Sequence, residues 1–182
     1  ASVLSRAQHG MEAPLVRVEA DLGTGLPTFT IVGLPEAVVK ESKDRVRAAI
    51  RNCGFEFPDG RITVNLSPAD LPKEGCRFDL PIAVGILLAS GQLPAANLER
   101  CELYGELSLS GEVRPVKGAL LAALAATRAG HSMIVPPLNA NEAGLVETTR
   151  APIPHLLLEV AAHAHRTQAL RFEHGKAPPM QA

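Results

Sequence analysis

The sequence predicts an α/β domain in which helices pack on a mixed β-sheet. Residues 1–34 are rich in alternating and β-branched segments, and helical and strand patterns interleave along the rest of the chain. Hydrophobic residues make up 46% of the 182 residues but aromatic residues only 3%, so Ala, Val, Leu and Ile must build the core. This composition and this order of elements favour one two-layer domain, α+β in arrangement, with a single core.

Strand patterns recur along the chain, each bounded by Gly, Pro or polar residues. Apolar and polar residues alternate in the first strand, and β-branched residues dominate the second. Residues 101–110 are expected to form two short strands or a hairpin arm that residues 111–115 continue. The other strands are expected at Leu15–Asp21, Thr28–Val32, Arg61–Asn65 and Ser132–Val135.

Helical patterns lie between these strands. The first helix begins near Glu36 and ends before Gly54, and Val46 and Ile50 belong to its buried stripe. The second is apolar nearly all round and should be buried, with Asp79 as its N-cap. This second helix is expected to span residues 80–90. Later helices are expected at 118–129 and 156–165, with a short helix after Asn139 between them.

Composition limits the classes of partner and compartment. The net charge is −1 and the pI is near 6.7, so any nucleic-acid binding must come from a local patch. The near absence of aromatic residues argues against base stacking on a platform. The longest apolar run, Leu80–Ala89, is far shorter than the roughly 20 residues of a membrane span. Three scattered cysteines form no disulfide framework, which together with the missing signal pattern predicts a cytoplasmic protein.

Neither a metal site nor a nucleotide site is expected in this chain. The six histidines and three cysteines show no ligand spacing. No G-x-x-x-x-G-K-[ST] phosphate loop occurs, and Gly23-Thr-Gly25 fits a turn.

One surface pattern could carry function. Four cations spaced for one helix face occur in the first helix, and such a row could follow a phosphate backbone; they are Lys40, Lys43, Arg47 and Arg51. The alternative is a solvated face whose charge is balanced by Glu36, Glu41 and Asp44.

Several ungapped stretches show a resemblance to a known family. The central one is Asn65–Gly75 (NLSPADLPKEG), followed by Phe78–Pro81 (FDLP). Three others occur in the matching order: SRAQHGMEA at 5–13, FTIVGLP at 29–35 and GELSLSGEVRP at 105–115. On these stretches the chain resembles the N-terminal part of the ComM/YifB family of magnesium chelatase-like proteins.

That resemblance implies a fold and a parent protein. The family's N-terminal domain is similar to the proteolytic domain of Lon, a fold with a left-handed βαβ unit that a ribosomal protein shares. An AAA+ ATPase module, assembled as a hexameric ring, would follow, so residues 1–168 are expected to be the Lon-like domain and 169–182 a linker. ATP and Mg²⁺ are expected only for that module. The family includes a DNA branch-migration motor of natural transformation, which makes DNA a candidate partner.

The resemblance to Lon also raises the question of peptidase activity. Lon uses a Ser nucleophile and a Lys amine. Here the stretch that matches the Ser carries Arg77, Phe78 and Asp79, with Cys76 beside them, and Leu120 fills the Lys position, three residues after Lys117. No catalytic residue is therefore expected.

The loops of a Lon-like fold place a second set of cations together. This set is expected to face solvent or a partner as a smaller basic edge; it consists of Lys73, Arg77, Arg114 and Lys117. The sequence thus predicts a non-catalytic accessory domain that guides DNA or supports ring assembly. A Lon-type peptidase and a pure protein–protein docking module remain the alternatives.

Overall fold

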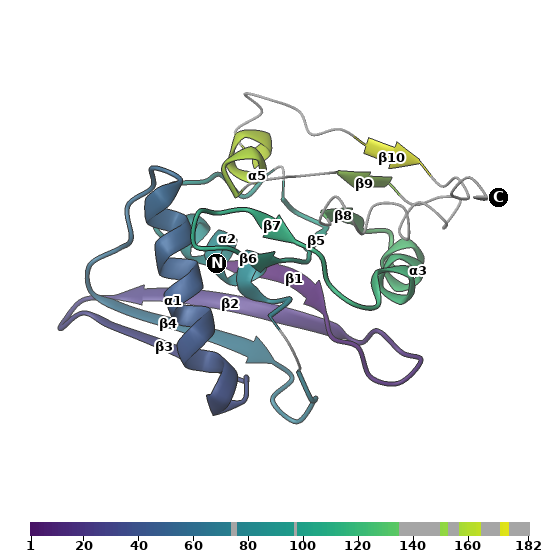
Figure 1. Cartoon of the computed structure of the whole chain (residues 1–182), viewed down its shortest axis with the longest axis horizontal. Coiled ribbons are helices and arrows are strands. Elements are labelled where there is room, and N and C mark those ends of the chain that lie inside the picture. Colours follow the sequence, from purple (N-terminus) through teal and green to yellow (C-terminus); the bar gives the residue numbers. More distant parts are fainter. Residues whose placement is uncertain (74–75, 97, 135–149, 153–156, 165–171, 175–182) are drawn as a thin grey trace.

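The computed structural model describes residues 1–73, 76–96, 98–134, 150–152, 157–164 and 172–174. Its main sheet has six strands in the order β3-β4-β2-β1-β5-β8 (Figure 1). Their bounds are Ser2–Arg6 (β1), Leu15–Gly23 (β2), Thr28–Val32 (β3), Arg61–Ser67 (β4), Cys101–Leu103 (β5) and Ser132–Ile134 (β8).

The sheet is mixed, as the sequence predicts. Strand β2 runs antiparallel to both β1 and β4, whereas β3 pairs parallel with β4, and β5 pairs parallel with β1 and β8. Buried and exposed residues alternate along β2, β3 and β4, so one face of this part of the sheet is covered and the other meets solvent.

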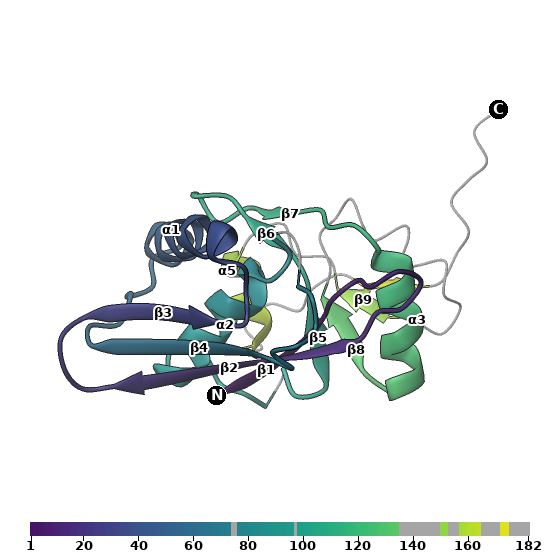
Figure 2. The ribbon, with the colours of Figure 1, turned by 90° about the horizontal axis from the view of Figure 1, so that it is seen from below.

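Helices α1 (Glu36–Asn52) and α2 (Asp79–Ala89) cover that face (Figure 2). The expected stripe of α1 is confirmed, since Val46 and Ile50 are fully buried. The helix ends where Gly54 takes a φ of 84°, a backbone conformation that glycine adopts without strain.

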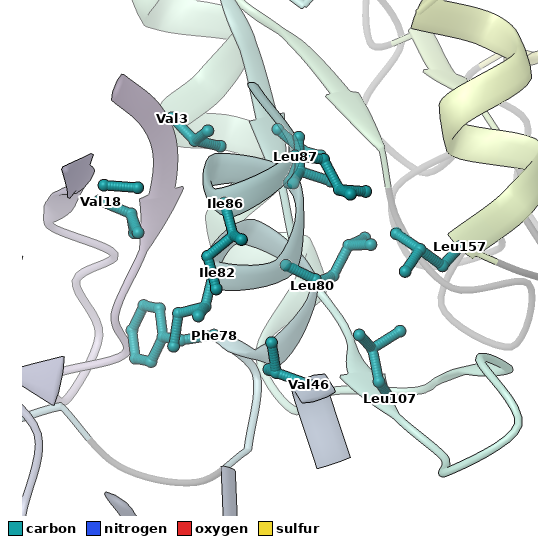
Figure 3. Close-up of a cluster of buried hydrophobic side chains, with 14 of the residues drawn as sticks. Val3, Val18, Val46, Phe78, Leu80, Ile82, Ile86, Leu87, Leu107 and Leu157 are labelled. Carbon is teal, nitrogen blue, oxygen red and sulfur yellow. The ribbon is translucent and has the colours of Figure 1, made fainter. Parts of the chain in front are cut away.

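Helix α2 is the centre of the core. All residues from Asp79 to Leu87 are buried, which matches its apolar composition. Figure 3 shows its side chains between the sheet, α1 and α5 (Leu157–Ala164), where Val18, Val46 and Leu157 meet it. Gly85 faces the sheet, where a Cβ would make ordinary van der Waals contact with Ala20 at 3.4 Å.

Helix α3 (Ala119–Ala129) packs on the opposite face, at the β5–β8 end. Met133 lies in its apolar cluster, while the next residue, Ile134, lies in the main core. Side chains of successive strand residues point to opposite faces, so this end of the sheet is covered on both sides. The fold is therefore two-layered over β3, β4 and β2 and three-layered at β5 and β8.

The remaining strands form two small sheets. The predicted hairpin arm is β6 (Glu106–Leu107) paired antiparallel with β7 (Val113–Arg114). Strand β10 (Phe172–His174), within the segment expected to be a linker, pairs antiparallel with β9 (Arg150–Pro152). The short helix expected after Asn139 lies outside the described residues.

Asp79 does not act as the predicted N-cap. Helix α2 has no side-chain cap, and the Asp79 carboxylate instead turns toward α1 and β6. It accepts hydrogen bonds from Ser42 Oγ at 2.7 Å, Arg45 Nε at 2.7 Å and the Leu107 backbone N–H at 3.1 Å. The carboxylate outweighs the effect of burial on Arg45 and raises the pKa of that guanidinium. The sequence pattern predicts a local helix cap, but in the structure the Asp79 carboxylate forms an ion pair with Arg45 of another helix instead.

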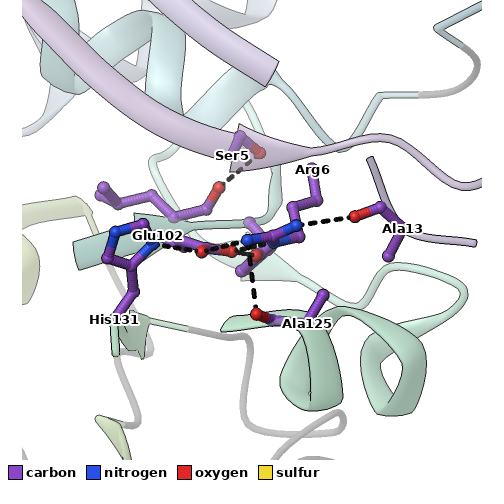
Figure 4. Close-up of polar contacts among 8 residues, drawn as sticks. Ser5, Arg6, Ala13, Glu102, Ala125 and His131 are labelled. Carbon is purple, nitrogen blue, oxygen red and sulfur yellow. Dashed lines mark hydrogen bonds and ion pairs between the residues drawn. The ribbon is translucent and has the colours of Figure 1, made fainter. Parts of the chain in front are cut away.

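A second buried carboxylate, Glu102, holds the α3 face of the sheet together (Figure 4). Arg6 binds it through Nε at 2.7 Å and Nη2 at 3.0 Å, His131 Nδ1 lies 2.7 Å away, and the Tyr104 hydroxyl donates to it. Burial and the neighbouring Glu102 raise the pKa of Tyr104 well above its usual value, so the phenol stays a donor. Arg6 also donates to the Ala13 carbonyl at 2.9 Å.

We expect Asp79→Ala to lower the free energy of unfolding by about 3–5 kcal/mol, because it leaves Arg45 and the Leu107 N–H without their buried acceptor. Urea denaturation measures this. The matched control, Asp21→Ala, removes an exposed carboxylate of β2 and should change stability by about 0.5 kcal/mol or less. Equal effects of the two variants would contradict the role of Asp79.

Glu102→Gln should lower the unfolding free energy by at least about 3 kcal/mol, because the Arg6 guanidinium would lose its buried counter-charge. Thermal and urea denaturation against Glu99→Gln, an exposed position, provide the measurement. A Glu102→Gln protein as stable as that control would show that the cluster does not depend on ionic attraction.

Candidate functional site

The four cations predicted on one face of the first helix do share a face of α1, beside edge strand β3. Lys40 and Arg51 are exposed, while Lys43 and Arg47 are half-buried. Lys43 Nζ donates to the Phe29 carbonyl oxygen at 2.9 Å. We call these four residues the α1 row.

Two phenylalanines support the α1 row from below. The Arg47 guanidinium lies 5.2 Å from the Phe57 ring centroid and 6.0 Å from that of Phe29, and Arg51 lies 5.7 Å from Phe57. Such cation–π contacts hold the cations over apolar rings without neutralising their charge.

The alternative of a charge-balanced face receives little support from the ion pairs. Glu41 pairs with Arg45 at 3.7 Å, and Arg45 points toward Asp79 on the other side of the helix. Among the described residues, no salt bridge joins a carboxylate to a member of the α1 row. Glu36 and Asp44 are exposed and lie one turn before and one turn after Lys40, so these two carboxylates weaken the local positive field.

The second predicted set does not form an exposed basic edge. Lys73 is only 2% exposed, and its ammonium donates to the carbonyls of Pro68 and Leu71 within its own loop. Burial lowers the pKa of Lys73. The prediction that it faces solvent or a partner is wrong, because a polar loop folded back on itself uses this side chain to satisfy its carbonyls.

Arg77 is buried as well, with 6% of its surface exposed, which corrects the same prediction for this residue. Its Nη2 donates to the Lys117 carbonyl at 2.9 Å, and the guanidinium lies 5.9 Å from the Tyr104 ring centroid. Arg114 and Lys117 are exposed. The structure therefore brings Arg77 and Lys117 together, as expected, but with Arg77 inside and Lys117 at the surface.

A cleft of about 670 Å³ opens at this place. Its walls come from three segments that are distant in sequence: the β1–β2 connection, the residues before α2, and β6 with the segment before α3. The side chains that give it chemical character are Gln8, Cys76, Arg77, Glu106 and Lys117.

Peptidase chemistry is not supported by the residues of this cleft. Burial raises the pKa of Cys76, which disfavours the thiolate that a nucleophile requires. Leu120, at the position of the Lon lysine, packs against the apolar cluster of α3. A guanidinium, a thiol and a leucine thus occupy the region where a hydroxyl and an amine would be needed.

Sequence reasoning missed the Glu102 cluster. The signal was a carboxylate in the three-residue strand Cys101–Leu103, whose other residues are apolar, and a cation at the end of β1. Parallel pairing of β1 with β5, which places Leu4 opposite Glu102, brings Arg6 to the same face. The Tyr104 ring between Glu102 and Arg77 joins this cluster to the cleft.

Neither a cluster of metal ligands nor a membrane-spanning helix occurs within the described part of the chain. No group of three or more His, Cys, Asp or Glu residues there could hold a metal ion. None of the described helices has the length and apolarity that crossing a bilayer requires.

Comparison with known proteins places these features in a family. The family model described as "Subunit ChlI of Mg-chelatase" matches residues 18–139. The chain is 53% identical over 160 residues to the competence protein ComM of Haemophilus influenzae, an alignment that covers 88% of this chain and 31% of ComM. It is 52% identical over 170 residues to YifB of Salmonella typhimurium, covering 93% of this chain and 34% of YifB.

A more distant similarity agrees with the fold. The Lon protease of Trichlorobacter lovleyi is 30% identical over 130 residues, which covers 68% of this chain and 16% of that protease. The mixed sheet with its helices fits the Lon-like fold that the sequence predicts, and the resemblance to ComM and YifB is confirmed. The chain spans about a third of the length of ComM and YifB. It belongs to the magnesium chelatase ChlI-like family, together with ComM and YifB.

Proposed function

We propose that this chain is a non-catalytic accessory domain of a magnesium chelatase-like AAA+ ATPase, and that it guides DNA for that motor. The observation that carries the proposal is the α1 row. Four cations over one helix face, without carboxylate partners among the described residues, form a surface that attracts a phosphate backbone. The row reads no base edges, so binding would not depend on sequence.

The family context supports this proposal. ComM, a relative with 53% identity over 160 residues, is a competence protein, and the resemblance to its family makes DNA a candidate partner. In the parent, the AAA+ module would supply ATP hydrolysis and Mg²⁺ binding and would assemble as a hexamer in the cytoplasm. Six copies of a weakly binding row around one ring would gain affinity through multivalency, which suits a surface with only four cations.

The two alternative functions, protein–protein docking and peptidase activity, have less structural support. A pure docking module would use the same helix face without DNA, and the exposed charge of Lys40 and Arg51 does not favour a dry protein interface. A peptidase would need an activated nucleophile, and burial raises the pKa of Cys76, the thiol that lines the cleft.

Charge reversal at the exposed ends of the α1 row tests DNA guidance. We expect Lys40→Glu/Arg51→Glu to weaken binding of single-stranded, duplex or branched DNA by about tenfold or more. The slope of log K plotted against log [salt] should also become shallower by about 2, because two phosphate contacts are lost. Fluorescence anisotropy across a salt series measures both. These exposed positions, of which Arg51 also contacts the Phe57 ring, are preferable to Lys43 and Arg47, which are half-buried and contact Phe29, so that their loss would change the packing more.

The control for that experiment is Arg17→Glu/Arg128→Glu, which makes the same charge change at exposed positions of β2 and α3. Asp44→Asn should raise the affinity several-fold, because it removes one of the two carboxylates beside the row. Equal weakening by the two double variants would mean that DNA senses only net charge. No binding by the wild-type domain at low salt would favour docking or ring assembly instead.

Alkylation of Cys76 tests the peptidase alternative. Because burial raises the pKa of Cys76, the thiolate fraction at pH 7 should be below that of an ordinary thiol, and the reaction with iodoacetamide should be slower than that of free cysteine at the same pH. Mass spectrometry of the labelled peptide, with Cys76→Ser as the blank, gives the rate. Rapid labelling at pH 6–7 would indicate an activated nucleophile and would support the peptidase function.

A further inference from the structure

The cleft contains a positive charge that the described structure does not neutralise. Only 6% of the surface of Arg77 is exposed, and its buried Nε atom has no hydrogen-bond partner. Among the described residues, no carboxylate pairs with it. Burial lowers the pKa of Arg77, opposed only by the nearby Tyr104.

Such a group is costly, because a buried charge normally needs an opposite charge and a full set of hydrogen bonds. Arg77 keeps one backbone acceptor, the Lys117 carbonyl, and the face of the Tyr104 ring. Tyr104 itself is committed to the already compensated Glu102. The guanidinium therefore faces the cleft wall with capacity left for an anionic partner.

The other polar groups of the cleft complete an anion site. Lys117 is exposed at the rim and adds a second cation, and Gln8 adds an exposed amide that can donate. Glu106 is the one carboxylate that the described lining contributes, and it interacts electrostatically with Arg45. The charged side chains of the lining are therefore two cations, Arg77 and Lys117, and one carboxylate, Glu106, so that their net charge is positive.

The size of the cleft indicates a small molecule. Its volume of about 670 Å³ lies within the range of roughly 300–1,000 Å³ that is typical of small-molecule sites. Pro115 and Val116 give part of the wall an apolar surface on which a ligand body could lie.

We propose that this cleft binds a small organic molecule through an oxyanion group, a carboxylate or a phosphate, which Arg77 and Lys117 recognise. This goes beyond DNA guidance, and it uses another surface. Arg45, which faces the cleft side, and Lys43, which contacts β3, lie on opposite sides of α1.

Titration of the isotope-labelled protein with inorganic phosphate in one arm and succinate in the other tests the site. Sodium chloride keeps the ionic strength constant. The expected result is a saturable shift of the Arg77 Nε–H resonance and of the Lys117 backbone amide in at least one arm. The arm that saturates at the lower concentration identifies the oxyanion.

Variants make the test specific. Lys117→Ala changes an exposed residue and should leave the fold intact while weakening binding roughly tenfold, the effect of losing one charge-assisted hydrogen bond. Arg77→Met should abolish it. Arg128→Ala, at an exposed position of α3, is the matched control and should bind as the wild type does.

The outcomes separate this site from the α1 row. Lys40→Glu/Arg51→Glu should leave phosphate and succinate binding unchanged even if it abolishes DNA binding. No saturable shift in either arm would overturn the proposal, as would equal weakening by Lys117→Ala and Arg128→Ala. Equal weakening by the α1-row variant and Lys117→Ala would also overturn it, since the anions would then be sampling general surface charge.

Discussion

The burial of α2 on all sides is the constraint on which the rest of the structure depends. A helix without a solvent face must be enclosed by the sheet, α1, β6 and α5, and its nine buried residues from Asp79 to Leu87 give each of those elements its apolar partner. Hydrophobic burial is non-directional, however, and would tolerate several rotations of α1 over α2. Asp79 removes that freedom, because one carboxylate binds Ser42 and Arg45 of α1 and the backbone of Leu107 in β6. The ion pair therefore supplies the orientation that the apolar contacts lack.

That orientation determines which cations reach the surface. With Arg45 turned inward to Asp79, helical geometry turns Lys43 and Arg47 toward β3 and its neighbouring phenylalanine rings. The α1 row is thus a consequence of the core. Few aromatic residues are present in this chain, and two of the five phenylalanines, Phe29 and Phe57, pack against each other at 5.5 Å beneath the row. They stabilise the arginine positions, and this use leaves Phe29 buried and unavailable for stacking on bases.

Local patterns were enough to predict most of the fold. The alternation in β2, the β-branched run of β3 and the apolar continuity of α2 each contain their own signal, and the structure places those elements at nearly the predicted residues. The failures concern charged side chains. Asp79, Lys73 and Arg77 all stand in a loop-like, polar stretch that predicts exposure or capping, yet each is buried because its partner comes from a distant segment or from the folded loop itself. The periodicity of a sequence indicates on which face of an element a residue lies. It does not indicate which distant residue will form a hydrogen bond or ion pair with that side chain.

The same reasoning explains why the cleft and the contribution of Gln8 escaped prediction, although Arg77 and Lys117 were expected to lie close together. It exists because the strand pairing of β1 with β5 and the packing of α3 bring Gln8, Arg77 and Lys117 to one place, although 69 and 40 residues separate neighbouring members of this set along the chain. Within it, the buried charge of Arg77 lacks a protein counter-charge among the described residues. A side chain that served stability alone would be replaced at little cost by an apolar one, since an unpaired buried cation is among the more expensive features of a core. A buried guanidinium at the wall of an open cleft is therefore better explained by an anion that it meets there than by packing.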